Sequence, residues 1–169
     1  MKIALISDIH DQVENLAWAK EEMRKHSIDF IFALGDYCTP YIIERLGIIG
    51  PPIIAVWGNN DGDKVAMMQA VEKDPQNKIQ FQRGQFAEIE LGGEKYFLTH
   101  YPLLAENAAL SRKYKAVFHG HTHQQRNDEY NGTPLINPGK LAVYPAGPVS
   151  WALYDTEEKT VEFINKPIK

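Results

Sequence analysis

Lys2-Ile3-Ala4-Leu5-Ile6-Ser7-Asp8-Ile9-His10 opens the chain and combines an apolar strand pattern with two side chains that can bind a metal. The run from Lys2 to Ile6 is almost entirely apolar, as is typical of a short strand that is buried on both faces. Asp8 and His10 follow at a spacing of two, and in extended backbone such side chains leave on the same side. The stretch therefore predicts a central strand with a polar site at its carboxyl end.

The segments that follow alternate between helix and strand patterns. Residues 12–26, 41–46 and 63–71 are predicted to be helical, the first with its apolar side chains spaced for one face. Residues 29–34 and 52–57 are short, nearly all apolar runs of the kind found in strands that helices cover. This order is the βαβ signature of an α/β fold.

From about residue 79 the pattern changes to closely spaced strands. They are predicted at residues 79–82, 85–91, 95–99, 116–119, 133–136, 150–154 and 160–164. Gly92-Gly93 and Asn131-Gly132 are typical of hairpin turns, and residues 103–110 form the one helix-like interruption. Strands first interleaved with helices and later joined as hairpins predict two sheets packed face to face, with helices on the outside.

Length and composition favour one domain with a substantial core. The chain has 169 residues and 44% hydrophobic content, and we expect a single domain over residues 1–169. The formal net charge of -4 shows no excess of Lys and Arg that could bind a nucleic-acid backbone, which argues against nucleic acid as a partner. Cys38 is the single cysteine, and the opening strand pattern leaves no room for a signal peptide. Because the apolar runs are also too short to span a bilayer, we expect a cytoplasmic protein with no membrane contact.

Metal-competent residues or glycines follow five of the strand-like runs. These groups are Asp8-Ile9-His10, Gly35-Asp36, Gly58-Asn59-Asn60-Asp61, His100 and Gly120-His121-Thr122-His123. Ligands collect at the carboxyl ends of strands in α/β sheets, so we expect the groups to converge. Carboxylate, imidazole and amide oxygen together suit Mn²⁺, Fe²⁺, Zn²⁺ or Ni²⁺ better than Mg²⁺ or Ca²⁺. Asp36 lies between two sets of ligands and is the natural bridge between two cations about 3.5 to 4 Å apart.

In this order the five motifs resemble those of the calcineurin-like metallophosphoesterases, and the length resembles the small, single-domain YfcE type. Ile136-Asn137-Pro138-Gly139 resembles a loop that usually follows in this type. The resemblance implies an α/β four-layer sandwich of two mixed β-sheets flanked by helices. It also implies two divalent metal ions, with Mn²⁺ as the first choice. It assigns Asp8, His10, Asp36 and His123 to one metal, and Asp36, Asn59, His100 and His121 to the other.

The resemblance implies a phosphodiesterase in which a hydroxide bridging the two cations attacks phosphorus in line. Asp36, Asn59 and His121 would act in catalysis through metal and substrate positioning. Larger relatives place a histidine general acid where this chain has Asn60, and an amide cannot donate a proton as an acid. We therefore expect substrates whose leaving groups need little protonation, with diesters ahead of monoesters. Lys140 stands where the small type commonly has Ser, and no effect is predicted for it.

Other functions stay open at this point. A phosphomonoesterase is one alternative, and a non-catalytic protein-binding scaffold of the same fold, similar to a retromer subunit, is another. The scaffold uses a degraded metal site, whereas here every ligand position is filled. A nuclease is disfavoured because the chain has no room for an additional DNA-binding cap. The expected partner is a small phosphate-ester substrate, and a homo-oligomer is compatible with the sequence.

Several residues near the motifs have simpler interpretations. Asp61 is expected to be the N-cap of the third helix, because Asp is a preferred cap. Tyr37 and Tyr101 flank predicted ligands and could wall a substrate pocket, which is the less favoured interpretation of both. Cys38 is expected to be a small buried hydrophobe near the site, and His119 a core or opposite-face residue.

Overall fold

The computed structural model describes residues 1–48, 50–73, 76, 78–82 and 84–167. Within this part of the chain the elements follow the order β1 (Lys2–Ile6), α1 (Val13–Met23), β2 (Phe30–Ala33), α2 (Pro40–Gly47), β3 (Ile53–Ala55), α3 (Lys64–Lys73), β4 (Ile79–Phe81), β5 (Phe86–Leu91), β6 (Glu94–Thr99), α4 (Pro102–Leu110), β7 (Ala116–Phe118), β8 (Gln125–Tyr130), β9 (Thr133–Pro138), β10 (Ser150–Asp155) and β11 (Thr160–Asn165). Every predicted helix is present, with its ends shifted by at most a few residues.

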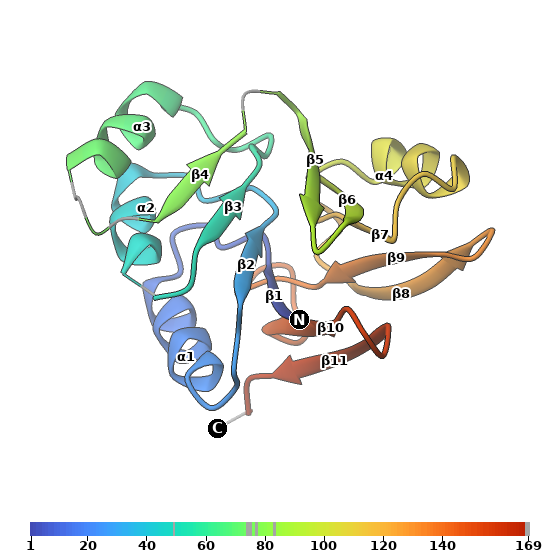
Figure 1. Ribbon diagram of the computed structural model, residues 1–169. Helices are drawn as coiled ribbons and strands as arrows, with labels where there is room; N and C mark the ends of the chain where they lie inside the picture. The colour runs from blue at the N-terminus through green and yellow to red at the C-terminus, as the bar shows by residue number, and fades with distance from the viewer. Residues whose placement is uncertain (49, 74–75, 77, 83, 168–169) are drawn as a thin grey trace.

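The strands form two mixed sheets. The first has the order β11-β10-β1-β2-β3-β4. Neighbours from β1 to β4 are parallel, whereas β10 pairs antiparallel with both β1 and β11. The second has the order β5-β6-β7-β9-β8, with parallel pairs at its centre and an antiparallel pair at each edge. Helices α1, α2 and α3 lie beside the first sheet and α4 beside the second (Figure 1). The predicted four-layer α/β fold is confirmed.

Three apolar cores separate the four layers, and β1 shows how one strand supplies two of them. Ala4 and Ile6 point to the core between the first sheet and α1 to α3. Ile3 and Leu5 point to the core between the two sheets, which also contains Phe118 of β7. This strict alternation follows from the period of two along a strand. A third core packs α4 against the outer face of the second sheet.

The hairpin predictions are confirmed, and one strand was missed. Leu91 pairs with Glu94 across the Gly92-Gly93 turn, and Tyr130 pairs with Thr133 across the Asn131-Gly132 turn. The missed strand is β8, whose sequence Gln-Arg-Asn-Asp-Glu-Tyr has no apolar alternation. It lies at the edge of its sheet with no fully buried residue, so packing imposed no apolar pattern on it.

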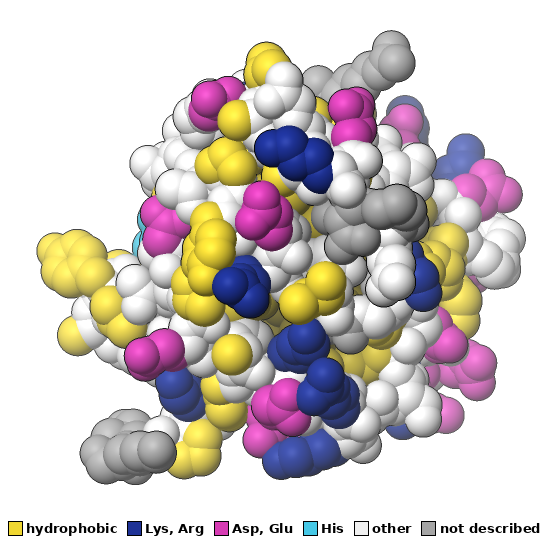
Figure 2. Space-filling model, turned by 90° about the vertical axis from the view of Figure 1, so that its left-hand side faces the viewer, with side chains coloured by type: hydrophobic (Ala, Val, Ile, Leu, Met, Phe, Trp, Pro, Cys, Tyr) yellow, Lys and Arg dark blue, Asp and Glu magenta, His cyan; other side chains and the backbone are white. Residues whose placement is uncertain are grey.

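The surface over α1 to α3 carries both charges. Figure 2 shows Lys and Arg side chains interspersed with Asp, Glu and apolar side chains on this face. The mixture agrees with the small negative net charge of -4. None of the described helices is long and apolar enough to cross a membrane.

Candidate metal centre

The predicted ligands lie at the carboxyl ends of strands in both sheets. They are Asp8 and His10 after β1, Asp36 after β2, Asn59 after β3, His100 after β6, and His121 and His123 after β7. Strands β1, β2 and β3 are parallel neighbours, as are β6 and β7, so each sheet delivers its loops at one edge. The contacts between these side chains, given below, show that all seven meet at the junction of the two sheets.

The extended backbone that the spacing of two predicts is wrong for both pairs. Asp8 and His10 have φ angles of 52° and 44°, and those of His121 and His123 are 71° and 59°. These values lie in the left-handed region, which Asp and His tolerate better than most residues and which is common at functional sites. The paired side chains therefore converge through tight turns instead of through strand alternation.

The first cluster, defined as Asp8, His10, Asp36 and His123, surrounds two carboxylates with two imidazoles. His123 Nε2 lies 3.2 Å from Asp8 Oδ1, and His10 Nε2 lies 3.8 Å from the same oxygen. His10 Nε2 is also 3.4 Å from Asp36 Oδ2. Both carboxylates are buried, whereas the imidazole side chains are 27% and 16% exposed for His10 and His123. The cluster can be reached from solvent only on its histidine side.

The second cluster, defined as Asp36, Asn59, His100 and His121, shares the Asp36 carboxylate with the first. Asp36 Oδ2 lies 3.5 Å from His100 Nε2. Asn59 Oδ1 lies 2.9 Å from His100 Nε2 and 2.8 Å from His121 Nδ1, and the two ring nitrogens are 3.2 Å apart. His100 is fully buried, whereas Asn59 and His121 are exposed. A ligand from solvent would therefore meet Asn59 and His121 first.

Atoms without hydrogen-bond partners show that these residues fit metal ions. Asp8 Oδ1 and His10 Nε2 are buried and make no hydrogen bond, only the ion-pair contacts of 3.2 to 3.8 Å given above, and a coordinating cation would satisfy both atoms. In the second cluster His100 Nδ1 donates to Leu34 O at 2.8 Å, so Nε2 points toward Asn59 Oδ1 and Asp36 Oδ2. Burial opposes a charge on His100, but the contact with Asp36 outweighs it and raises the pKa of the ring. A cation that replaces the proton at Nε2 would be bound by this nitrogen, the amide oxygen and the carboxylate together. Two trios, Asp8-His10-His123 and Asp8-Asp36-His100, have the compactness that one ion requires.

Electrostatics keep the carboxylates ionised. Burial opposes the charge on Asp8, but His10 and His123 outweigh it and lower its pKa to about 2. The pKa of Asp36 is also lowered, because His10 and His100 together outweigh its burial. In return Asp36, followed by Asp8, raises the pKa of His10 to about 9. Without a metal, His10 therefore carries a proton at neutral pH and acts as the counter-ion of the two carboxylates.

Asp61 is not the N-cap of α3, contrary to the prediction, and it has a different function in the site. Helix α3 begins at Lys64, and Asp63 Oδ1 accepts a hydrogen bond from Ala66 N at 2.9 Å, as a cap does. The Asp61 carboxylate is buried and accepts hydrogen bonds from four backbone N–H groups: those of Asp36 at 3.1 Å, Tyr37 at 2.7 Å, Cys38 at 3.0 Å and Gly58 at 2.7 Å. It thereby ties the loop after β2 to the loop after β3.

Asn60 also holds Asp36. Its backbone N donates to Asp36 Oδ1 at 2.8 Å, and its side-chain amide donates to Asp36 Oδ2 at 2.7 Å. Gly58 permits this approach, because a Cβ at that position would collide with Asp36 Oδ1. Asn60 and Asp61 thus hold the shared Asp36 in place. The Gly58-Asn59-Asn60-Asp61 motif shows that both residues are present, but it does not show which contacts they make.

The tyrosines near the motifs differ from each other. Tyr37 is 1% exposed and its hydroxyl lies 2.8 Å from Ala33 O and 3.0 Å from Val56 O, which share its one proton, so it belongs to the core and does not wall a pocket. Tyr101 packs edge-on against His100, with ring centroids 5.4 Å apart, and lies 6.1 Å from the ring of His121. Tyr101 therefore borders the second cluster.

Three further residues stand beside the ligands. Cys38 Sγ lies 3.5 Å from His10 Nδ1, and burial raises the pKa of its thiol to about 12, so it remains a neutral thiol. His119 is fully buried as predicted, and burial lowers its pKa to about 4. Lys140 is 1% exposed and its ammonium donates to Pro145 O. The burial of a lysine here is a feature that the sequence analysis did not predict.

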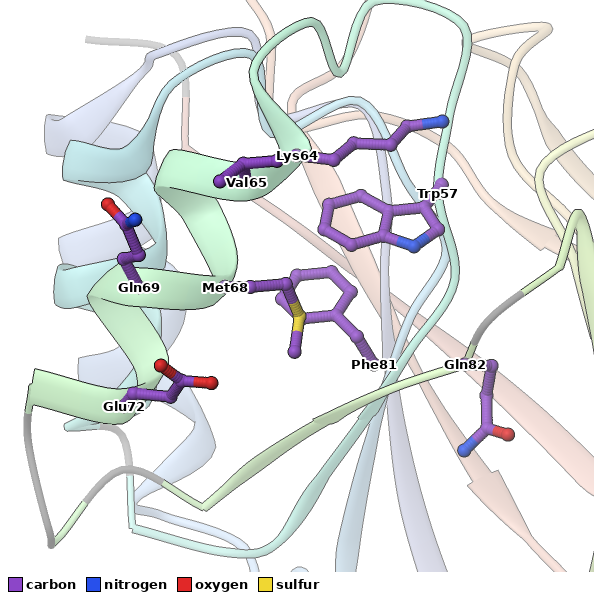
Figure 3. Close-up of a pocket in the computed structure, with 8 residues that line it drawn as sticks. All are labelled: Trp57, Lys64, Val65, Met68, Gln69, Glu72, Phe81 and Gln82. Atoms are coloured by element: carbon purple, nitrogen blue, oxygen red, sulfur yellow. The ribbon is translucent and has the colours of Figure 1, made fainter.

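A separate groove of about 700 Å³ lies between α3 and the first sheet. Figure 3 shows Lys64 and Met68 projecting from α3 toward Trp57 and Phe81. The remaining lining residues are Val65, Gln69, Glu72 and Gln82. The Trp57 and Phe81 rings stack with centroids 3.9 Å apart, and Lys64 Nζ lies 5.5 Å from the Trp57 ring centre. The lining contains none of the seven predicted ligands, so the groove is distinct from the Asp and His clusters.

Comparison with known proteins gives a family match over nearly the whole chain. The profile of the calcineurin-like phosphoesterase superfamily domain matches residues 1–159. Phosphodiesterase MJ0936 of Methanocaldococcus jannaschii is 30% identical over 161 residues, which cover 94% of this chain and 95% of that protein.

Solved structures agree with the sequence matches. A structure described as a novel archaeal phosphodiesterase superposes with a TM-score of 0.89 at 29% identity, covering 98% of this chain and 100% of its own. YfcE, a phosphoesterase from E. coli, superposes with a TM-score of 0.72 at 20% identity, covering 97% and 98%. At that identity the second likeness concerns the fold alone.

Proposed function

We propose, because this chain belongs to the calcineurin-like phosphoesterase superfamily, that it is a metal-dependent phosphodiesterase acting on a small phosphate ester. Membership of this family makes the chain a hydrolase of phosphoester bonds. The preference for diesters over monoesters is what we propose in addition. The observation that carries the proposal is the convergence of two carboxylates, one amide and four imidazoles around the shared Asp36. This donor set suits Mn²⁺, Fe²⁺, Zn²⁺ or Ni²⁺, and Mn²⁺ is the first choice on the family resemblance alone.

In this proposal the first cluster holds one cation and the second cluster holds the other, with Asp36 shared. Two divalent ions bound there would supply a bridging hydroxide for in-line attack and would neutralise charge on the phosphate. Asp36 would be the residue that both ions share, and Asp61 and Asn60 hold Asp36 in place. Asn59 and His121 are the exposed members of the set, which supports their assignment to substrate positioning.

The diester preference rests on Asn60. Its side-chain amide donates to Asp36 Oδ2, so it serves the carboxylate and has no acidic proton for a leaving group. General acid catalysis typically contributes about 10² to 10⁴-fold, and its loss matters least for leaving groups that need little protonation. A phosphomonoesterase remains the nearest alternative within the same chemistry.

A protein-binding scaffold is the alternative from another class. Two observations favour turnover over it. All seven ligand positions carry competent donors, and two exposed ligands, Asn59 and His121, face solvent where a substrate can reach them. A scaffold needs neither feature.

The test is hydrolysis of bis-p-nitrophenyl phosphate beside p-nitrophenyl phosphate, with Mn²⁺ or with EDTA, for wild type and His121→Ala. We expect Mn²⁺-dependent cleavage that is faster for the diester and is lost in His121→Ala. A faster monoester reaction would replace diesterase with monoesterase. If protein with bound Mn²⁺ hydrolyses neither ester, the protein-binding scaffold is the better description.

A further inference from the structure

The segment after the Asn-Pro-Gly loop forms a short projection beside the first cluster. We define residues 141–148 as the lip. Its first residues are tied to the end of β1: Leu141 N donates to Ser7 O and Asp8 O, both at 3.2 Å, and Ala142 N donates to Asp8 O at 2.8 Å. The lip therefore starts against the backbone of a predicted metal ligand.

The middle of the lip touches a second predicted ligand. Tyr144 O lies 3.2 Å from His123 Nδ1, so a protonated Nδ1 donates to this carbonyl and presents Nε2 to Asp8. The lip is thus in contact with the first cluster both through Asp8 and through His123. It is a border of the site and not a distant loop.

Lys140 closes the base of the lip. Its buried ammonium donates to Pro145 O, across the loop from its own backbone. Its carbonyl accepts from Ser150 N at 2.8 Å, and it forms an isolated bridge with Val149. A lysine side chain is seldom buried, because its rotamer freedom and hydration are lost. Here the Lys140 ammonium lies inside the loop and connects its beginning, at Lys140, to its middle, at Pro145.

Two apolar side chains extend from this fixed backbone into solvent. Val143 is 60% exposed and Tyr144 is 82% exposed. Single exposed apolar residues are ordinary on protein surfaces. Two in succession, on a backbone fixed at both ends beside a polar centre, match the usual composition of a ligand site, in which apolar surface surrounds a few polar groups.

We propose that the lip is a recognition subsite for an apolar or aromatic substituent of the phosphate ester. Tyr144 is its specificity-determining residue and Lys140 its positioning residue. This inference rests on the proposed function, because the phosphate group of the same ligand is bound by the two clusters. Offset or edge-on packing of an aromatic ring against Tyr144 would add to the affinity that the phosphate supplies.

The test uses two phosphonates that differ only in their substituent. Binding of phenylphosphonate and of methylphosphonate to the Mn²⁺-loaded protein is measured by calorimetry, without any need for turnover. In wild type we expect phenylphosphonate to bind more tightly. Tyr144→Ala should weaken phenylphosphonate about two- to tenfold and leave methylphosphonate unchanged, whereas Tyr144→Phe, which retains the ring, should behave as wild type.

Lys140→Met should give the same selective loss, because the lip keeps its side chains but loses its inner contact. Leu110→Ala, which removes an exposed apolar side chain on α4, is the remote control and should change neither affinity. Equal affinity of wild type for the two phosphonates, binding of neither, or an equal effect of Tyr144→Ala on both would overturn the proposal. Selective loss in a protein that hydrolyses no diester would keep the subsite and reject the phosphodiesterase, so the two failures are distinguishable.

Discussion

The two clusters of the site share one carboxylate and differ in almost everything else. The first adds the buried Asp8 to Asp36, so two negative charges meet there, and its ionisation is strongly perturbed. The second adds the neutral amide of Asn59 and places two ligands at the surface. We infer that the first cluster holds its cation more tightly, because it offers more negative charge away from water, and that the second is where a substrate meets the metal.

The largest effect is expected from Asp36→Ala, which removes the one group that both clusters use. Charge stabilisation by the ions amounts to several kcal/mol, so diester hydrolysis should fall by at least about 10³-fold. Bound Mn²⁺ should fall below one equivalent, measured by metal analysis after gel filtration. Glu90→Ala, at an exposed position of β5, is the charge-matched control and should retain two equivalents. Two tightly bound equivalents in Asp36→Ala would contradict the shared position.

The difference between the clusters is tested directly by His121→Ala against His123→Ala. We expect His121→Ala to retain one tight equivalent of Mn²⁺, because both carboxylates of the first cluster remain. His123→Ala should weaken that tight equivalent by more than about 100-fold, since removal of a ligand exceeds the effect of removing its hydrogen-bond partner. Titration with Mn²⁺, followed by the paramagnetic signal of the free ion, measures both constants. Loss of both equivalents in His121→Ala would mean that the clusters do not bind separately.

A smaller effect is expected from Asp61→Asn, which keeps the size of the side chain but turns one acceptor oxygen into an amide. The amide would face backbone N–H groups that now donate to Asp61, so the loop that carries Asp36 should shift. Catalytic rate should fall about 10- to 100-fold, as is typical when a residue that orients a ligand is lost. The free energy of unfolding should fall by about 3 kcal/mol, because buried hydrogen bonds to a charged group are lost.

The hydrogen bonds from the N–H groups of residues 36–38 and Gly58 to the Asp61 carboxylate are called the Asp61 clamp below. Asp63→Ala is the matched control for this clamp. It removes the cap of α3 two residues further on, with an expected cost of about 1 kcal/mol in the free energy of unfolding and no change in rate. Urea denaturation and steady-state kinetics on both variants separate the two functions. Equal rates for Asp61→Asn and wild type would show that the clamp serves stability alone.

The comparison of the clusters also predicts a pH dependence of metal binding at the first cluster, which needs no substitution. His10 is protonated in the metal-free protein up to a pKa of about 9, and it must become neutral to bind a cation. Mn²⁺ binding should therefore release a proton at pH 7.5, and its affinity should rise about tenfold per pH unit and level off near pH 9. Calorimetry in buffers with different ionisation enthalpies measures the proton.

The same shift predicts the stability of the metal-free protein. Because the pKa of His10 is raised from 6.5 to about 9, its contribution is complete below pH 6.5 and is lost as the pH rises to about 9. His26→Asn, which changes a histidine beside Trp151 and outside both clusters, should leave the proton release unchanged. Absence of proton release in wild type at pH 7.5 would contradict the protonated state of His10.

The sequence predicted the layers, and it predicted which side chains converge, because both depend on local patterns. Apolar runs at strand length located β1 to β3, and polar residues directly after them located the site. The edge strand β8 could not be predicted, because a strand that is open to solvent needs no alternation of apolar residues. Backbone conformation could not be predicted either, since nothing in the order Asp8-Ile9-His10 distinguishes an extended pair from one with positive φ.

Contacts between distant segments were the second kind of information that local patterns could not supply. Asp61 is a good helix cap by composition, and only the fold brings the N–H groups of residues 36–38 to its carboxylate. Lys140 has a charged side chain that predicts exposure, and only the return of the chain at Pro145 gives it a buried partner.

The Asp61 clamp has a consequence for how the protein acquires its ions. Ordering a loop of several residues around a cation costs conformational entropy when the ion itself has to impose the order. Here backbone hydrogen bonds to a carboxylate that is not itself a predicted ligand hold the Asp36 loop, so that entropy is lost once, when the chain folds. On the proposed function, ions would then exchange at the centre without remaking the loop.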